Sequence, residues 1–549
     1  MTIATSLACI AILITLLLFS PAGALIPYPK VWNKTSSAYS LRTIHTGDFE
    51  LVTDSTYILQ GAAKRISDWF RLPDAFIDYP VNPSRNELIS LRQLRVLVES
   101  NCTELIHGVD ESYVLTIPTN SDVTLQSKTV FGALRGLETF AQLIEYGWIE
   151  DNTGQVIFTL MSPQYIDDAP SYPYRGLLID TARHYLPMEL LLTNLDAMAM
   201  NKLNVLHWHM TDSQSWPYQS QQYPELSDHG AFRSDLVYTA ENIQHLVREA
   251  YYRGIRVIPE FDLPGHSAAV AKSHPEWMSH CPPRDYYDSP PILDPTNSDV
   301  HHFIKDLYDE ILTLFSTADM IHVGGDEVPL ECWKNDPAIQ KWRRIHNVTD
   351  EIALFELFEE ALLTIVETRQ AIVWQEVFDL GINISQNTIV DVWKGDQDAD
   401  SMFRATAAGH GVVLSSCWYL DHLDDDWYQY YQCDPRDKLN ATITTDAQYQ
   451  RVLGGHASMW GEQVDSSNFM SRVWPRASSM AERLWSGSTA GDGTTIRDRM
   501  ASFRCHMVRR GIDAGPIGPG VCDKEPRFNK NADSSVKGDL GPALTYDKQ

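Results

Sequence analysis

Basic side chains are scarce in this chain of 549 residues. Lysine and arginine together number 44 against 72 aspartates and glutamates, so the formal net charge is -28 at pH 7. Nucleic acids and anionic membrane surfaces attract basic patches, and this balance therefore argues against both as partners. It fits a protein that stays in solution in an acidic compartment, although an ordinary acidic secreted protein has the same charge signature.

Long apolar runs are lacking as well, except at the start of the chain. Residues 7–19 are apolar apart from Thr15 and precede three small residues at 22–24, which is the pattern of a secretory signal peptide. A helix needs about 20 apolar residues to span a bilayer, and no run of this length occurs anywhere in the chain. We therefore predict a signal peptide at residues 1–24 and a mature chain that begins near Leu25, is exported and has no membrane span.

Cysteine is sparse, and its number becomes odd once the signal peptide is removed. The chain has 8 cysteines, of which Cys9 lies in the signal segment. At least one thiol of the mature protein is therefore unpaired or pairs with another chain. Asn-x-Ser/Thr sequons, which are glycosylated only in exported chains, support the predicted compartment. The sequons are at Asn33, Asn101, Asn347, Asn383 and Asn440.

The length predicts two domains, because a mature chain of about 525 residues exceeds what a single core usually holds. Residues 25–165 mix strand patterns with a helical pattern, which indicates an N-terminal α+β domain. Residues 94–100 and 113–118 have strand character, and residues 130–147 carry apolar side chains at helical spacing. The stretch 162–176, rich in proline and aspartate, is typical of a hinge before the next domain.

The second domain, residues 166–522, alternates short apolar strands with amphipathic helices. Eight strand candidates with helices between them predict an α/β fold of the (β/α)8 TIM barrel type. A doubly wound open sheet is the alternative that the pattern alone allows. We expect the polar tail at residues 523–549 to be disordered. The strand candidates are residues 176–180, 204–210, 255–262, 320–327, 371–378, 388–394, 411–419 and 452–460.

Carboxylates and aromatic rings gather at the predicted carboxyl ends of these strands, where a barrel places its active site. Carboxylates bind sugar hydroxyls and indole faces stack on pyranose rings, so this composition predicts a carbohydrate site. Asp326 and Glu327 are adjacent, whereas ordinary retaining glycosidases hold two carboxyl groups about 5 Å apart on opposite sides of the bond. The residues at the strand ends are Asp180, Arg183, His209, Asp212, Glu260, Asp262, Asp326, Glu327, Trp374, Glu376, Trp393, Tyr419, Asp421, Trp460 and Glu462.

Long motifs in this region carry a family resemblance. In chain order they are RGLLIDTARHYLP, NVLHWHMTD, IPEFDLPGH, HVGGDEV, VWQEVF and GGHASMWGE. Their order and spacing resemble those of the family 20 glycoside hydrolases, most closely the animal lysosomal β-N-acetylhexosaminidases. The resemblance runs from about residue 90 to Cys522 and includes FGALRGLETFAQLI in the first domain. It implies a small α+β domain before a barrel, the fold that the periodicity predicts.

The resemblance implies an activity and a compartment. Such enzymes remove terminal, non-reducing, β-linked N-acetylglucosamine or N-acetylgalactosamine from glycoconjugates, without a cofactor or a metal ion. The expected partners are thus glycans with a terminal N-acetylhexosamine, and the expected location is lysosomal or secreted.

The resemblance also explains why two acidic residues are adjacent. In this family the 2-acetamido oxygen of the substrate attacks the anomeric carbon and gives an oxazolinium intermediate, so the enzyme supplies no nucleophile. Glu327 would be the general acid and base, and Asp326 would orient the acetamide nitrogen and stabilise its developing positive charge. An ionised Asp326 would also raise the pKa of Glu327 and keep Glu327 protonated.

Further positions match the substrate-binding residues of the family. Arg183 would bind sugar hydroxyls, although a structural ion pair is the alternative. Tyr419 would donate to the acetamide carbonyl, and Trp374, Trp393 and Trp460 would enclose the acetamide methyl group. The remaining assignments are Asp212 and His266 as support for the acid, Glu462 as acceptor from a distal hydroxyl, and Asp421 as an acidic neighbour of the 6-position that discourages a 6-sulfate.

The cysteines and one loop depart from the family pattern. The pairings that the resemblance implies are Cys281 with Cys332 and Cys505 with Cys522. Cys102 has no upstream partner, and Cys417 and Cys433 lack a family counterpart but can pair with each other. The loop 420–431 is acidic and lacks the tyrosine that related dimeric enzymes contribute across their interface. The sequence therefore leaves a homodimer undecided.

Two other classes of function are alternatives. A zinc-dependent hydrolase is the first, because His207 and His209 face the same side of one strand and Asp212, His266 and His322 are further ligand types. A sugar-binding protein built on an inactive hydrolase fold is the second, and the intact acidic pair argues against it. Activity in a strong chelator would remove the first alternative. Turnover of a chromogenic N-acetylglucosaminide would remove the second.

Overall fold

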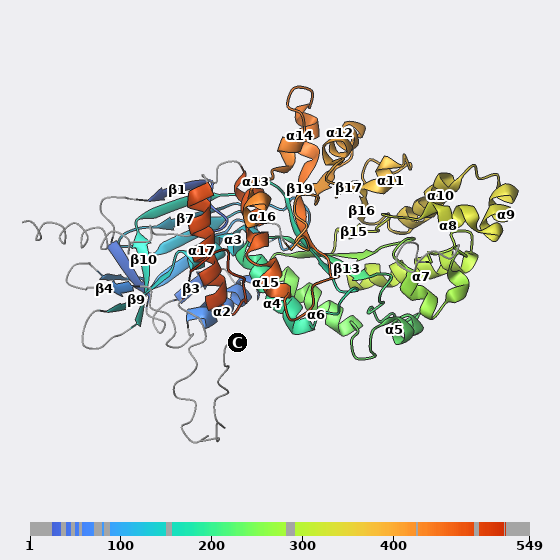
Figure 1. Ribbon diagram of the computed structural model, residues 1–549. Helices are drawn as coiled ribbons and strands as arrows, with labels where there is room; N and C mark the ends of the chain where they lie inside the picture. Colours follow the sequence, from blue (N-terminus) through green and yellow to red (C-terminus); the bar gives the residue numbers. More distant parts are fainter. Residues whose placement is uncertain are drawn as a thin grey trace, which may run out of the picture.

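The structure is a computed structural model that shows an N-terminal domain followed by a barrel (Figure 1). The predicted signal peptide, Asn101, Asp424 and Asp425 and the tail 523–549 lie outside the described residues. No helix within the described ranges is long and apolar enough to cross a membrane. These ranges are 25–34, 40–44, 50–53, 57–70, 79–81, 88–100, 102–149, 156–281, 291–423, 426–487, 493–520 and 522.

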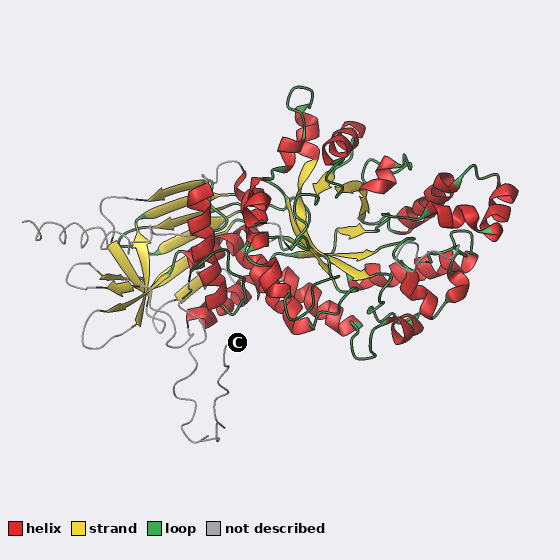
Figure 2. Cartoon of the chain, in the orientation of Figure 1, coloured by secondary structure: helices red, strands yellow, loops and turns green. Residues whose placement is uncertain are grey.

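The N-terminal domain combines two sheets with helices (Figures 1 and 2). The larger sheet has the strand order β1-β11-β7-β8-β6-β3, and the smaller has the order β4-β9-β10-β2-β5. Helices α2 (Tyr57–Phe70) and α3 (Val130–Gln142) contact each other, and α3 packs on strands of the larger sheet. The strands are β1 Val31–Lys34, β2 Ser40–Ile44, β3 Glu50–Thr53, β4 Tyr79–Val81, β5 Leu88–Ser90, β6 Gln93–Val98, β7 Tyr113–Ile117, β8 Val123–Ser127, β9 Glu145–Ile149, β10 Val156–Ser162 and β11 Gln164–Asp168.

Local sequence explains the elements that were predicted in this domain. β7 alternates buried and half-buried residues, as expected for a strand with one face on the core. α3 begins after Thr129, whose hydroxyl accepts a hydrogen bond from the Gly132 amide at 3.1 Å. The helix predicted within residues 130–147 is present as α3 and ends at Gln142, and β9 starts at Glu145. Residues 145–149 contain two aromatic residues and isoleucine, which favour a strand, and a glycine, which disfavours a helix.

The predicted hinge at residues 162–176 is part of the folded structure instead. Its residues Gln164–Asp168 form β11, which pairs antiparallel with β7. Asp168 is buried and lies 3.2 Å from the Nζ atom of Lys202, which belongs to the barrel. The turn-forming composition is thus overridden by the ladder and by a buried ion pair, which together attach this segment to both domains.

The barrel closes from eight parallel strands in chain order, β12 to β19. Closure through β12 and β19 excludes the open sheet and confirms the TIM-type fold. Buried apolar side chains of Tyr174, Val205, Ile258, Met320 and Ile372 form part of a separate cluster inside the barrel. The strands are β12 Tyr174–Asp180, β13 Val205–Thr211, β14 Arg256–Phe261, β15 Met320–His322, β16 Gln370–Trp374, β17 Ile389–Val392, β18 Val412–Leu414 and β19 Val452–Met459.

Helices surround the barrel and bury a second, larger apolar cluster against it (Figure 2). The 3-10 helices are η1 Ala268–Lys272, η2 Pro275–Trp277 and η3 Pro435–Lys438. The α-helices are α4 Met188–Met200, α5 Pro224–Gly230, α6 Ala240–Tyr251, α7 Ser298–Leu314, α8 Leu330–Asn335, α9 Pro337–His346, α10 Glu351–Ile365, α11 Gln375–Asp379, α12 Asp398–Ala408, α13 Trp427–Gln432, α14 Asp446–Arg451, α15 Phe469–Val473, α16 Arg476–Ser486 and α17 Gly493–Arg509.

Two predicted strands are shorter than expected at the ends that matter for the site. β15 ends at His322, so Asp326 and Glu327 lie in the following loop and not on the strand. β16 ends at Trp374, and Glu376 lies on the short helix α11. Asp326, Glu327 and Glu376 therefore follow the ends of β15 and β16 and are not part of these strands.

Glu111 joins the two domains and gives a test of their interface. Its buried carboxylate lies 2.8 Å from Arg135 Nε of α3 and 2.7 Å from Arg175 Nη2 of β12. Burial raises the pKa of Glu111, but the two arginines outweigh it and lower this pKa below 4.5. Removing one member of such a buried network leaves the others uncompensated, at a cost of about 3 to 5 kcal/mol.

We therefore expect Glu111→Gln to reduce the free energy of unfolding by that amount at pH 7, measured by urea denaturation. The depressed pKa means that the contribution of Glu111 is complete above about pH 4.5 and declines as the pH falls further. Glu104→Gln, at an exposed position of the same domain, is the matched control. A loss no larger than that of the control would contradict the role of Glu111.

Candidate active site

The loop after β15 sends Asp326 and Glu327 into different surroundings. Gly324, Gly325 and Glu327 have positive φ angles of 78°, 94° and 50°, which turn the chain sharply at each position. A Cβ atom on Gly324 would lie 1.9 Å from Asp262 Oδ1, and one on Gly325 would lie 2.5 Å from a methyl group of Val377. The diglycine is thus required sterically, and it lets two consecutive carboxylates occupy different places.

Asp326 is a buried acceptor with an unused oxygen. No hydrogen-bond donor among the described residues reaches its Oδ1 atom. Burial raises the pKa of Asp326 to about 6, against the opposing effects of the His266 charge and a hydrogen bond with Asp262. Burial and the charge of Asp326 raise the pKa of Asp262 well above its ordinary range, so Asp262 carries the shared proton. A buried acceptor without a donor indicates a place for an N–H or O–H group of a ligand.

Glu327 faces the opening of the barrel. Its side chain is 57% exposed, and its Oε2 atom lies 3.5 Å from Nε2 of His266. The hydrogen bond with His266 lowers the pKa of Glu327 below 4.5, although partial burial opposes this shift. The expectation that Asp326 raises the pKa of Glu327 is therefore wrong for the free protein. The hydrogen bond and the charge of His266 lower this pKa and outweigh the neighbouring carboxylate.

A line of contacts supports Glu327 from inside the barrel. Nδ1 of His266 lies 3.1 Å from Asp212 Oδ2, and the same oxygen lies 3.1 Å from Nε2 of His209. Nδ1 of His209 lies in turn 2.9 Å from Glu260 Oε2. Burial lowers the pKa of His266, but the charges of Asp212 and Asp326 outweigh it and raise this pKa well above its ordinary value. His266 is therefore held as a cation beside Glu327.

Arg183 takes part in an ion-pair network and also borders the site. Its Nη1 lies 3.0 Å from Asp180 Oδ2, and its Nη2 lies 2.7 Å from Asp212 Oδ2 and 3.9 Å from Glu462 Oε1. The guanidinium carbon lies 5.1 Å from the ring centroid of Trp460. The structural ion pair that was the predicted alternative for Arg183 is present. Each terminal nitrogen keeps a second hydrogen, so the ligand-binding role stays a prediction.

Four aromatic residues form two ring pairs at this end of the barrel, and one of them, Tyr419, feels the charge of Asp326. The ring centroids of Trp374 and Trp460 are 6.2 Å apart, and those of Trp393 and Tyr419 are also 6.2 Å apart with nearly parallel planes. A hydrogen bond between the side chains of Tyr419 and Trp460 connects the two pairs. Burial raises the pKa of Tyr419 well above its ordinary value, so the phenol keeps its proton. Trp374 is buried, and the other three rings are half-buried.

Carboxylates fix the orientation of two of these rings. The indole N–H of Trp374 donates to Glu260 Oε1 at 2.8 Å, and that of Trp393 donates to Glu376 Oε2 at 2.9 Å. Lys394 lies 2.8 Å from the second oxygen of Glu376. The sequence assigned no role to Asp262, Glu376 or Lys394. The first two were visible as acidic residues near strand ends, whereas Lys394 gave no signal, since the residue after a strand faces the site only by virtue of tertiary structure.

Asp421 and Glu462 lie at the rim of this region. Asp421 is half-buried, and its Oδ1 has no donor among the residues that the structure describes. Burial raises the pKa of Asp421 to about 6, and the charge of Glu462 adds to this shift. Glu462 itself is 53% exposed. His422 is exposed, and its ring centroid lies 5.6 Å from that of Tyr419.

The histidines of the zinc hypothesis lie along one network of carboxylate contacts, in which His207 and His209 share the Oε2 atom of Glu260. His209 and His266 both contact Asp212 near the opening of the barrel. His207 and His322 lie deeper, where Nε2 of His207 is 2.8 Å and Nδ1 of His322 is 3.4 Å from Glu260. The ligand atoms of His207, Glu260 and His322 lie within 4.8 Å of one another, but all three side chains are fully buried. The predicted ligands thus do not form one cluster that a substrate could reach.

Three disulfides join residues of the barrel domain. Cys281 pairs with Cys332 and Cys505 with Cys522, in the pairing that the resemblance implied. Cys417 and Cys433, which the sequence left open, pair with each other. Cys102 is free and exposed. The sequons at Asn33, Asn347, Asn383 and Asn440 are exposed as well, so glycans can be attached without disturbing the core.

The structure brings the candidate residues together at one end of the barrel. Asp326 and Glu327 lie in the loop after β15, and Nε2 of His266 lies 3.9 Å from the first carboxylate and 3.5 Å from the second. The aromatic rings of Trp393 and Tyr419 are nearby. Two carboxylates in different environments, beside aromatic faces and hydrogen-bond donors, are the groups that a site for binding and protonating a sugar requires.

Comparison with known proteins gives matches over both domains. A family model described as "Glycosyl hydrolase family 20, catalytic domain" matches residues 172–488, and one described as "beta-acetyl hexosaminidase like" matches residues 25–143. The chain is 42% identical over 437 residues to the beta-hexosaminidase subunit beta of Homo sapiens, covering 78% of this chain and 76% of the relative. It is 38% identical over 441 residues to the subunit alpha of Mus musculus, covering 78% of this chain and 81% of the relative.

Solved structures resemble the fold as well. A chitobiase of Flavobacterium johnsoniae superposes with a TM-score of 0.75 at 28% identity, covering 89% of this chain and 73% of that chain. An exo beta-N-acetylglucosaminidase of Vibrio harveyi superposes with a TM-score of 0.73 at 21% identity, covering 91% of this chain and 80% of that chain. The second comparison supports the fold alone.

Proposed function

Because this chain belongs to glycosyl hydrolase family 20, we propose that it is an exo-acting β-N-acetylhexosaminidase that removes terminal, non-reducing, β-linked N-acetylglucosamine or N-acetylgalactosamine from glycoconjugates. The chain is a glycoside hydrolase by family, and the identity of the sugar rests on the named relatives together with the site. Three groups carry out the proposed reaction: the side chains of Glu327 and Asp326 and the acetamide of the substrate.

The proposed reaction proceeds in two steps with retention of configuration. In the first, the acetamide oxygen attacks the anomeric carbon while Glu327 gives its proton to the glycosidic oxygen, and the aglycone leaves. Asp326 accepts a hydrogen bond from the acetamide N–H and compensates the positive charge that develops there. In the second step, water attacks the anomeric carbon of the oxazolinium, Glu327 takes the water proton, and the acetamide is restored.

The observation that carries this proposal is the unused Oδ1 atom of buried Asp326, one residue before the exposed Glu327. If Asp326 were a nucleophile, its oxygen would have to reach the anomeric carbon of the sugar. A buried acceptor near indole rings instead suits the N–H and the methyl group of an acetamide. Tyr419 is proposed to donate to the acetamide carbonyl, and Trp374, Trp393 and Trp460 to enclose the methyl group. Arg183 and Glu462 are proposed to bind the distal hydroxyls.

Turnover of a chromogenic N-acetylglucosaminide by the purified mature chain tests this function. Release of the chromophore is expected, and it should persist in a strong chelator because the proposed steps need no metal. Binding of the sugar without turnover would indicate a lectin-like protein instead. Loss of turnover in chelator, with recovery on adding zinc, would favour the metal-dependent alternative.

The pH dependence of kcat/KM follows from the two carboxyl groups. The productive state has Asp326 ionised and Glu327 protonated, although the pKa of Asp326 is about 6 and that of Glu327 is below 4.5. The productive state is therefore the less populated of the two states in which the pair holds one proton. The profile is still bell-shaped, and its two limbs lie at the pKa values of the two carboxyl groups, because the pair must hold one proton. We expect a maximum between about pH 4 and 6 and a falling basic limb near pH 6. An optimum above pH 7 would contradict the assignment.

Asp421 is proposed to read the 6-position of the terminal sugar. Its free Oδ1 can accept from a neutral 6-hydroxyl, whereas its charge repels a 6-sulfate at a cost of about 1 to 3 kcal/mol. We expect unsulfated N-acetylglucosaminides to be preferred roughly five- to hundredfold in kcat/KM at pH 7. The preference should narrow as the pH falls through about 6, where Asp421 takes up a proton.

Asp421→Asn should shift the preference toward the sulfated substrate, while Asp437→Asn at an exposed position should not. Equal efficiencies on both substrates in the parent, or no response to Asp421→Asn, would mean that this loop does not contact the 6-position.

Export and assembly are the remaining parts of the proposal. We infer a lysosomal or secreted protein from the predicted signal peptide and from the exposed sequons. A homodimer is the proposed assembly, since the named relatives are subunits. Light scattering on the glycosylated protein tests this assembly, and a monomer mass at micromolar concentration would exclude it.

A further inference from the structure

The segment after β18 carries two of the proposed substrate contacts, Tyr419 and Asp421. Both side chains are half-buried, whereas Trp418 and Leu420, which alternate with them, are fully buried. The amide of Leu420 donates to the carbonyl of Ser458 at 2.8 Å, which attaches the segment to β19. The alternation therefore leaves Tyr419 and Asp421 on the face of the segment that is not buried in the core.

The chain turns at Asp421. The amide of His422 donates to the carbonyl of Tyr419 at 3.2 Å, which closes a turn with Leu420 and Asp421 at its centre. The hydroxyl of Tyr430 on α13 donates to the same carbonyl of Tyr419 at 2.8 Å. These bonds hold the peptide group that follows Asp421, and they leave the carbonyl of Leu420, in the peptide group that precedes Asp421, to another donor.

Arg476, the first residue of α16, supplies that donor. Its Nη2 donates to the carbonyl of Leu420, and its Nη1 donates to the carbonyl of His422 at 3.1 Å. Since the amide of His422 is bound to Tyr419, both peptide groups that flank Asp421 are held by hydrogen bonds. An arginine suits this task because its planar fork offers several donors in a fixed geometry.

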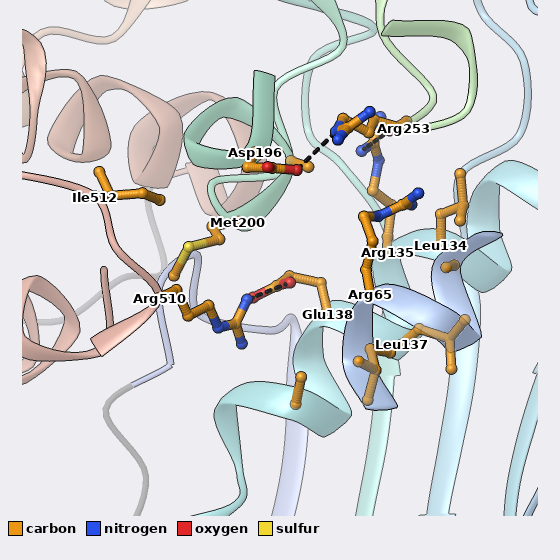
Figure 3. A pocket seen from close by; sticks show the side chains of 14 residues that line it. Arg65, Leu134, Arg135, Leu137, Glu138, Asp196, Met200, Arg253, Arg510 and Ile512 are labelled. Atoms are coloured by element: carbon orange, nitrogen blue, oxygen red, sulfur yellow. Dashed lines mark hydrogen bonds and ion pairs between the residues drawn. The ribbon is translucent and has the colours of Figure 1, made fainter. Parts of the chain in front are cut away.

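Arginines in the cavity between the two domains have a different kind of partner (Figure 3). There Arg253 lies 2.7 Å from Asp196, so its guanidinium compensates the charge of a carboxylate. The guanidinium of Arg476, by comparison, donates to three backbone carbonyls, of which the third is that of Arg472 at 2.8 Å. Hydrogen bonds of this kind fix the course of the backbone.

The direction of the Asp421 side chain depends on this backbone. No donor among the residues that the structure describes reaches its Oδ1 atom, so the turn has the main part in aiming that oxygen, because allowed side-chain rotamers follow from the backbone angles. Burial raises the pKa of Asp421 to about 6, and the charge of Arg476 opposes this shift. Arg476 thus acts on Asp421 through its fork of donors and through its charge, and substitution can separate the two.

We propose that Arg476 is a positioning residue for the choice of substrate, whose fork of donors holds the turn so that Asp421 faces the 6-position of the terminal sugar. The inference rests on the proposed role of Asp421. A carboxylate held in one direction accepts from a 6-hydroxyl and repels a 6-sulfate, whereas a carboxylate on a loose turn can move away from the sulfate. Loss of the fork should therefore relax the discrimination more than it lowers the rate on the neutral substrate.

Arg476→Lys tests the fork, because lysine keeps the charge but lacks the planar set of donors. At pH 7 the ratio of kcat/KM for unsulfated over 6-sulfated chromogenic N-acetylglucosaminides should fall about three- to tenfold, the effect of roughly one hydrogen bond. Arg476→Met, which also removes the charge, should lower the ratio at least as far. Arg472→Met, which removes an exposed charge from α15 and keeps the Arg472 carbonyl, should leave the ratio unchanged.

The ratio separates positioning from a purely structural role, since loss of folded enzyme lowers both rates equally. In an Asp421→Asn background, Arg476→Lys should have no further effect on the ratio, because both changes act through the same carboxylate. If Arg476→Met does not fold, Arg476→Lys decides alone.

Two results would overturn the inference and leave the proposed role of Asp421 intact. The first is a ratio that responds to Asp421→Asn but not to either Arg476 variant. The second is a ratio that falls in Arg476→Met but stays at the parental value in Arg476→Lys, which would assign the effect to charge alone. Equal efficiencies of the parent on the two substrates would remove the role of Asp421 and this inference together.

Discussion

Glu327→Gln is expected to fold normally and to lose about 10² to 10⁴ in kcat on substrates with a poor leaving group, such as a chitobiose-like disaccharide. The amide keeps the shape and the hydrogen bond to His266 but carries no transferable proton. The exposed position of Glu327 means that little stability is at stake, so a loss of activity reports on chemistry.

The leaving group provides an internal control for this variant. A dinitrophenyl aglycone departs without protonation, so its first step should be far less affected than that of the disaccharide. Glu331→Gln, which replaces an exposed glutamate on α8, should retain parental rates on both. Hydrolysis of the disaccharide by Glu327→Gln at the parental rate would show that another group protonates the leaving oxygen.

Asp326→Asn is expected to lower kcat/KM by about 10² to 10³, because the acetamide loses its charged partner as positive charge develops on nitrogen. The amide of asparagine can also present a donor where an acceptor is needed, which leaves the N–H of the substrate without a partner. A substrate with a hydroxyl in place of the 2-acetamido group should be nearly inert with the parent enzyme.

The effects of Asp326→Asn and of removing the 2-acetamido group from the substrate should not be additive, because both changes remove the same interaction. Asp326→Asn should therefore cost little further activity on the substrate that lacks the acetamide. The measurement is kcat/KM for the four combinations of enzyme and substrate. Full additivity, or comparable rates of the parent on the two substrates, would show that Asp326 acts elsewhere than on the acetamide.

The barrel was predictable because its strands are short apolar runs that are buried on both faces, a local property of the sequence. The identities of Asp326, Glu327 and Tyr419 followed from motifs. The course of the loop after β15 did not, since it depends on the contact of Gly324 with Asp262 and of Gly325 with Val377. These contacts join separate strands and helices and leave no periodic signal.

The protonation order of the acidic pair was also beyond the sequence. Adjacency suggested that Asp326 raises the pKa of Glu327, but burial acts on Asp326 and the His266 cation acts on Glu327. His266 owes its charge to Asp212 and Asp326, which come from different parts of the chain. Burial and through-space charge of this kind appear only once the barrel has assembled these residues.

The central claim is that the substrate's own acetamide is the nucleophile, and a series of fluorinated acetamides tests it most directly. Each fluorine withdraws electrons from the carbonyl oxygen and weakens its attack, while the aglycone and the ring stay the same. If the acetamide is the nucleophile, kcat/KM for the N-acetyl, monofluoroacetyl, difluoroacetyl and trifluoroacetyl glucosaminides should fall steeply, by about 10² or more across the series. A flat series, with the trifluoroacetyl substrate hydrolysed about as fast as the acetyl substrate, would contradict it.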